Sequence, residues 1–197
     1  MGQIIVTVSR EFGSGGHQLA SIIAERLGVP LYDKNILEHM AQKNNITAES
    51  LHKFDEMKRR GFNRTIGGYT TSAQEHVAQI EFEFIREKAA SGESFVVVGR
   101  CSDYILRDNP NTFKIFVMSD MAQKIERVSR LYHVSEEEAK RMAHKLDKTR
   151  RAYHNFYSDM KWGDSRGYDL CINTAKLGID VTAQQVCDII AAFAIKN

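Results

Sequence analysis

A glycine-rich turn close to the start of the chain has the composition of a phosphate-binding loop. The turn consists of Gly13, Ser14, Gly15, Gly16 and His17. It follows an apolar, β-branched run at 4–8 and precedes residues 18–27, whose apolar positions have helical spacing. Backbone N–H groups without neighbouring side chains can surround an anion, and the helix N-terminus adds partial positive charge. An ordinary βα turn also favours glycine. Three glycines within four residues exceed what such a turn needs, so phosphate binding is favoured.

Two pairs of charged residues later in the chain could complete a phosphoryl-transfer site. Arg127 and Arg130 are three residues apart and share a helix face, as do Asp147 and Arg150 on the following helix. Cations of this kind balance the charge that spreads over a phosphoryl group in transfer. Considered alone, these residues are better explained as surface salt-bridge partners of nearby glutamates. Together with the glycine loop, they are equally consistent with a flap that closes over phosphates.

The elements that must position these residues alternate along the chain. Strands are predicted at 4–8, 29–32, 95–99, 113–118 and 169–172, with helices between them. This alternation predicts a three-layer α/β/α fold with a five-stranded, mainly parallel sheet and a helical lid. The glycine loop follows the first strand, Asp33 the second and Arg100 the third. All of them therefore fall on the carboxyl edge of the sheet, where such folds bind ligands.

The helix boundaries have their own sequence signals. Gly28 stands where the C′ residue of the first helix belongs, and Ser135 begins a capping box for a helix that runs towards Arg150. Thr182 is expected to cap the C-terminal helix. The remaining helices are predicted at 34–44, 48–57 and 73–90 and from about 121, and the polar, basic stretch 58–72 is predicted to be a loop.

Composition narrows the classes of protein that fit. A length of 197 residues suits one domain, and 27 basic against 25 acidic residues give no general affinity for polyanions. The cluster at 58–64 is therefore weak support for nucleic-acid binding. Three cysteines without a CxxC pair support neither a disulfide framework nor a metal site. No leader or membrane-length apolar run is evident, so a cytoplasmic protein is expected. Helix 73–90 could be core or the surface of a homo-oligomer.

Five stretches, in order along the chain, resemble the cytidylate kinase-like family, a branch of the P-loop nucleoside monophosphate kinases. They are Val8–Gly16, Leu31–Lys34, Val98–Leu106, Asp147–Arg150 and Trp162–Thr174. The resemblance implies a core, an acceptor-binding segment at 34–94 and a lid at 120–165. It also implies transfer of the ATP γ-phosphate, with Mg²⁺, to a small nucleotide, CMP or dCMP.

The resemblance also implies roles for particular residues. The donor phosphates would be held by Arg10 and residues 13–17. The acceptor would be bound by Asp33, Lys34, Arg100 and Asp103. In the lid, Asp147 and Arg150 match a D-x-x-R pair, while Arg127 and Arg130 would neutralise transferred charge.

The loop departs from the full P-loop pattern, G-x-x-x-x-G-K-[ST], at three positions. Arg10 replaces the leading glycine, Gly16 the lysine and His17 the hydroxyl residue. Loss of a comparable electrostatic group typically costs about 10²–10³ in rate. Either Arg10 or a lid arginine supplies the missing charge, or the loop binds an anion without efficient chemistry. Magnesium could be held by Asp33 or Ser14, because it needs few protein ligands.

Overall fold

A computed structural model describes residues 2–33, 36 and 71–196, and these contain a five-stranded parallel sheet. The strand order is β2-β3-β1-β4-β5. The strands are β1 (Ile5–Arg10), β2 (Leu31–Tyr32), β3 (Phe95–Val98), β4 (Thr112–Met118) and β5 (Leu170–Asn173). The predicted parallel sheet is confirmed. Each of the five strands was predicted to within a few residues, and the helices predicted within 34–57 lie outside the described residues.

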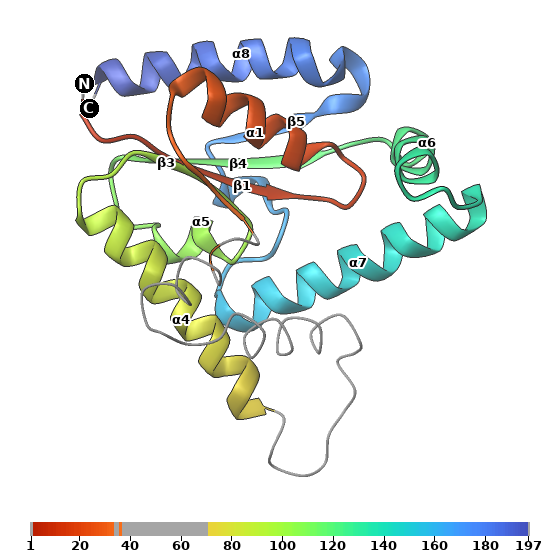
Figure 1. The fold of residues 1–197 in the computed structure, drawn as a ribbon, viewed down its shortest axis with the longest axis horizontal. Helices are drawn as coiled ribbons and strands as arrows, with labels where there is room; N and C mark the ends of the chain where they lie inside the picture. The colour runs from red at the N-terminus through yellow and green to blue at the C-terminus, as the bar shows by residue number, and fades with distance from the viewer. Residues whose placement is uncertain (1, 34–35, 37–70, 197) are drawn as a thin grey trace.

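Helices cover both faces of this sheet, so the fold has the three layers expected (Figure 1). Helices α1 (Gly16–Leu27) and α8 (Thr174–Lys196) lie on one face, and α4 (Thr71–Ala90) and α5 (Ser102–Ile105) lie on the other. The alternation of side chains along a strand serves both layers. Val6 and Val8 pack with α1 and α8 on one face, whereas Ile5 lies on the other face and packs against α4.

A pair of helices at the carboxyl edge of the sheet occupies the region that was predicted to be the lid (Figure 1). Helix α6 (Met121–Tyr132) follows β4, and α7 (Glu136–Tyr157) starts at Ser135, whose hydroxyl accepts from the Glu138 N–H at 3.2 Å. A short 3-10 helix, η1 (Ser165–Gly167), leads into β5. Phe12 from the loop after β1 is buried together with Val128 of α6 and Ala139 of α7. The lid therefore packs directly on the candidate phosphate-binding loop.

The C-terminal helix differs from its prediction. Helix α8 begins at Thr174 and has a kink at Gly178, where φ is +72°. Thr182 lies within the helix, four residues after this kink, and therefore does not cap it. Instead the Thr182 hydroxyl donates to the Gly178 carbonyl, four residues earlier, at 2.5 Å. Residues Thr174–Ile195 are long and apolar enough to cross a membrane by length and composition. However, Ala183 and Ile190 lie in the core against α1 and the sheet, as in a core helix.

Candidate active site

The loop between β1 and α1 has the conformation of an anion cradle. Gly13 and Gly15 have φ of +78° and +80°, the left-handed region in which glycine is favoured. Ser14 is fully buried, where its hydroxyl donates to the Glu11 carbonyl at 2.8 Å and accepts from Gly16 N–H at 3.3 Å. The N-cap residue of α1, Gly15, has no side chain, so the N–H groups that follow Gly16 at the start of the helix have no N-cap side chain as acceptor. Ser14 therefore shapes the loop and is not free to bind a metal.

Three side chains from late in the chain hold the carbonyl groups of this loop. Arg150 Nη1 donates to the Arg10 carbonyl at 3.0 Å, and Arg127 Nη1 donates to that of Gly13 at 2.7 Å. The Thr174 hydroxyl donates to the Ser14 carbonyl at 2.6 Å. Burial lowers the pKa of both arginines, and for Arg127 the nearby charge of Arg130 adds to that effect. The structure thus brings Arg127 and Arg150 to the loop, and their catalytic roles stay predictions.

Lys124 joins the lid to the loop, a role that the sequence did not reveal. Its side chain is 3% exposed, and its Nζ lies 2.7 Å from Asp147 Oδ2 and 3.1 Å from Glu11 Oε2. The other oxygen of Asp147 accepts from the Phe12 N–H at 2.6 Å. The sequence indicates only that Lys124 lies three residues before Arg127 on the same face of α6, and not that it is buried between carboxylates.

Arg10, Asp33 and His17 form a charged group at the mouth of the loop. Asp33 Oδ1 lies 3.8 Å from Arg10 Nη2, and Asp33 Oδ2 lies 3.2 Å from His17 Nε2. Burial alone would raise the pKa of Asp33, but the hydrogen bond from His17 and the charge of Arg10 lower it overall. Asp33 is therefore an ionised carboxylate and a weak base at neutral pH.

The lowered pKa of Asp33 predicts how stability changes in acid. A carboxyl group with a depressed pKa contributes stability above its unfolded value, here 3.8, and loses it as pH falls through the folded value. We expect Asp33→Asn to be less stable than the wild type at about pH 6, with the gap closing towards about pH 3. Urea unfolding of both proteins across this range measures the gap. A constant gap would show that Asp33 is not coupled to its cationic neighbours.

Arg100 lies at the end of β3 on an unusual backbone. Gly99, Arg100 and Cys101 have φ of +73°, +58° and +56°, three consecutive left-handed residues. Non-glycine residues in this region cost of order 1–3 kcal/mol each and occur often at functional sites. The turn directs Arg100 towards α4, where its Nη1 lies 2.7 Å from Oε1 of the fully buried Glu81. Arg100 thus stands beside the loop on the α4 side.

Two other predicted residues, Asp103 and Arg130, do not join this group. Asp103 is buried, with its carboxylate 3.2 Å from the Ser9 hydroxyl and 2.7 Å from His154 Nε2, so it links α5 to α7. Arg130 is exposed on α6, and Lys34 lies outside the described residues. Their predicted roles in binding or transfer stay predictions.

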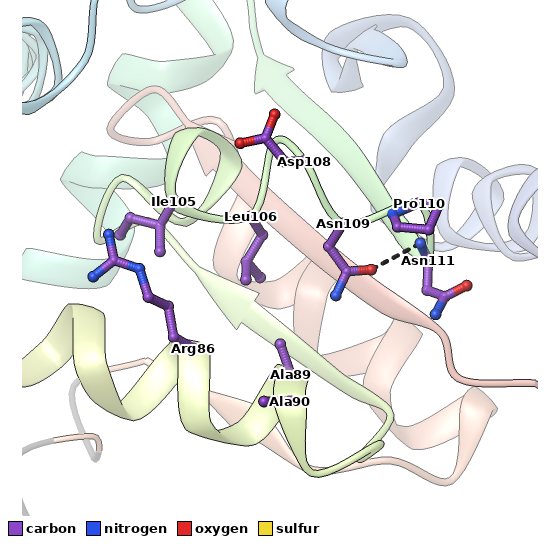
Figure 2. Close-up of a pocket in the computed structure, with 9 residues that line it drawn as sticks. All are labelled: Arg86, Ala89, Ala90, Ile105, Leu106, Asp108, Asn109, Pro110 and Asn111. Carbon is purple, nitrogen blue, oxygen red and sulfur yellow. Dashed lines mark hydrogen bonds between the residues drawn. The ribbon is translucent and has the colours of Figure 1, made fainter.

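A surface hollow of about 460 Å³ lies elsewhere, at the opposite edge of the sheet (Figure 2). It is lined by the last turns of α4, by α5 and by the turn 108–111 before β4. This edge holds the amino ends of the strands, away from the loop after β1. The hollow is therefore not part of the candidate site.

The chain is similar to known proteins over most of its length, including the strand β1 and the glycine loop that follows it. The sequence profile of the cytidylate kinase-like family matches residues 5–176. A cytidylate kinase of Thermococcus kodakarensis is 27% identical over 184 residues, covering 91% of this chain and 83% of that protein.

Solved structures show the same architecture. The crystal structure of an uncharacterized protein from Eubacterium ventriosum is 38% identical, with a TM-score of 0.77 and coverage of 96% of this chain and 99% of that one. A gluconokinase from Sinorhizobium meliloti shares the fold at 18% identity, with a TM-score of 0.59 and coverage of 99% and 95%. By the extent of the profile match, and with the P-loop kinase fold, this chain belongs to the cytidylate kinase-like family.

Proposed function

We propose that this protein transfers the γ-phosphate of ATP to a nucleoside monophosphate, with CMP and dCMP the first acceptors to test. The observation that carries the proposal is the convergence of cations on one loop. Arg127 and Arg150 bind its carbonyls, and Arg10 lies at its mouth. Phosphoryl transfer needs positive charge around the moving group and the oxygens that attack and leave.

The chemistry of the site favours a phosphate acceptor over a hydroxyl acceptor. A hydroxyl needs a general base to accept its proton, whereas a phosphate monoester is already largely ionised near neutral pH. Two carboxylates of the site are engaged by cations: Asp33 faces Arg10 and His17, and Asp147 holds Lys124. The lowered pKa of Asp33 also makes it a poor base. The name of the Thermococcus relative, cytidylate kinase, supports the same acceptor class.

The residues of the loop fit a triphosphate and, in part, its magnesium ion. The left-handed glycines and the start of α1, where the N-cap residue is a glycine, suit phosphate oxygens. Among the described residues, no cluster of three or more His, Cys, Asp or Glu side chains forms a metal cage. Mg²⁺ needs only one or two carboxylates besides phosphates and water, and Asp33 at the loop mouth would hold it. The ion would neutralise charge on the phosphates.

Direct measurement of product tests this proposal. Purified protein is incubated with MgATP and CMP, dCMP, UMP or AMP in turn, and formation of ADP and the nucleoside diphosphate is followed by anion-exchange chromatography. We expect turnover with at least one of these acceptors, CMP first. Binding of nucleotide without ADP formation for any acceptor would refute the kinase proposal. That result would favour the alternative, a nucleotide-binding protein of this fold with impaired catalysis.

Arg100→Lys tests the acceptor side separately. Lysine keeps a positive charge opposite the buried Glu81 but loses the planar fork that binds phosphate in two places. We expect the KM for the acceptor to rise about 10-fold, the loss of roughly one charge-assisted hydrogen bond. The affinity for ATP should stay unchanged. Equal effects on both substrates would contradict a role of Arg100 on the acceptor side.

A further inference from the structure

Positions 10 and 16, which depart from the P-loop pattern, face each other across the loop. A Cβ atom added to Gly16 would lie 2.5 Å from Cβ of Arg10 and 3.0 Å from its Cγ. Gly16 is the first residue of α1 and is not left-handed, so its backbone does not require glycine. What excludes a side chain at position 16 is therefore the Cβ and Cγ atoms of residue 10, here an arginine, with Val117 Cβ a weaker neighbour at 3.2 Å.

The far end of Arg10 lies against a second glycine, Gly99, whose φ of +73° also favours glycine. A Cβ atom added to Gly99, at the end of β3, would lie 2.1 Å from Arg10 Nη1. Arg10 therefore runs from the end of β1, past the start of α1, to the end of β3, while its other terminal nitrogen faces Asp33. Two glycines leave room for this one side chain.

The charges around Arg10 favour an anion. Burial is the main effect that lowers the pKa of Arg10; the neighbouring guanidinium groups of Arg150 and Arg100 add to it, and Asp33 opposes it. An arginine nevertheless stays protonated in proteins. The side chain of Arg10 is 19% exposed, so part of it faces the space at the loop mouth. Positive charge in excess of the nearby carboxylate is relieved when an anion binds there.

We propose that Arg10 is the catalytic cation that replaces the P-loop lysine, and that it binds the terminal phosphates of ATP along the path the lysine would take. The usual pattern has glycine at the first position and lysine at the seventh. Here the first position is Arg10 and the seventh is Gly16. The pair therefore still consists of one cationic side chain and one glycine, with their positions exchanged. This inference rests on the proposed ATP-dependent function, because it names the residue that contacts the donor.

Arg10→Met tests the role of the charge. We expect the affinity for MgATP, measured by isothermal titration calorimetry, to fall about 10- to 100-fold, as for loss of hydrogen bonds to a charged group. Turnover should fall about 10²–10³-fold. Arg10→Lys should recover part of both. The matched control is Arg166→Met. The Arg166 side chain is 86% exposed and paired with Asp164, and the residue is far from the loop in sequence. It should change neither quantity.

Gly16→Lys tests the shared space. The added side chain must displace Arg10, so this variant alone should lose affinity for MgATP by about 10-fold or more. The double variant Arg10→Gly/Gly16→Lys restores the usual pattern and clears the closest contacts. It should bind MgATP within about 10-fold of the wild type. Circular dichroism and thermal unfolding confirm that each variant is folded.

Gly99→Ala tests the far end of Arg10 against a matched glycine. Gly28 has a similar φ, +66° against +73°, but an added Cβ there meets nothing within 4 Å. Both alanine variants carry the backbone strain, and only Gly99→Ala pushes Arg10. We expect only Gly99→Ala to weaken MgATP binding.

The outcomes separate the two proposals. Wild-type protein that binds MgATP without turnover refutes the kinase proposal, and the affinities of the variants still test Arg10. Normal affinity and turnover in Arg10→Met would overturn the role of Arg10 and leave the kinase proposal standing. Wild-type affinity in Gly16→Lys would refute the shared path, and a wild type that binds no ATP would refute the inference.

Discussion

Asp147→Ala should lower the free energy of unfolding by about 3–5 kcal/mol, the usual cost of removing one partner from a buried ion pair. Lys124 is 3% exposed, and its ammonium group would keep only Glu11 of the two carboxylates that now hold it. The Phe12 N–H would also lose its acceptor. Urea unfolding monitored by circular dichroism measures the loss.

Two further variants separate the charge from the hydrogen bond. Asp147→Asn retains an oxygen for the Phe12 N–H but removes the negative charge, so its loss should be smaller and should remain measurable if the alanine variant does not fold. Asp159→Ala removes an exposed carboxylate just beyond the end of the same helix and should stay within about 0.5 kcal/mol of the wild type. A loss below about 1 kcal/mol in Asp147→Ala would contradict the buried role of Lys124.

Arg150→Met should reduce kcat for phosphoryl transfer by about 10²–10³-fold, as for removal of a preorganised charge in an active site. Its guanidinium donates to the Arg10 carbonyl and lies 5.6 Å from the centre of the Phe12 ring. These two contacts hold the guanidinium group of Arg150 beside the loop. Steady-state kinetics with saturating MgATP and acceptor measure the change.

The neighbouring residue supplies the control. Arg151→Met makes the same substitution on α7, but Arg151 is exposed and lies against Trp162 at 5.6 Å from the ring centre. Its kcat should equal that of the wild type. An Arg150→Met enzyme within about threefold of wild type would mean that another cation carries the transferred charge.

Features set by local chemistry could be predicted from the sequence. Gly28 ends α1 as expected. Its left-handed conformation lets its own N–H donate to the Glu25 carbonyl, and the N–H of Val29 donate to the Ala24 carbonyl. Because the N–H of Val29 is bound to the end of α1, Val29 does not join β2, and that strand begins at Leu31 rather than at the predicted residue 29. The glycine loop after β1 and the helix cap at Ser135 could also be predicted, because each depends on residue types within a few positions of one another.

Features that depend on distant partners could not be predicted. A lysine on a helix is normally exposed, and only the approach of Glu11 and Asp147 makes Lys124 a buried cation. Asp103 follows a strand end, yet the turn after β3 places its carboxylate against His154, 51 residues later. The fit between Arg10 and Gly16 likewise depends on how β1 and α1 meet in space.

The side chains that hold the loop carbonyls also determine when the site can form during synthesis of the chain. Residues 10–14 are made early, but their partners lie 114, 140 and 160 residues later. Contacts so distant in sequence form slowly, because the entropy cost of closing a long loop must be met before the contact stabilises the chain. Because Thr174 is the last of these partners to leave the ribosome, the nascent chain cannot hold its loop in the observed form until most of the protein has been translated.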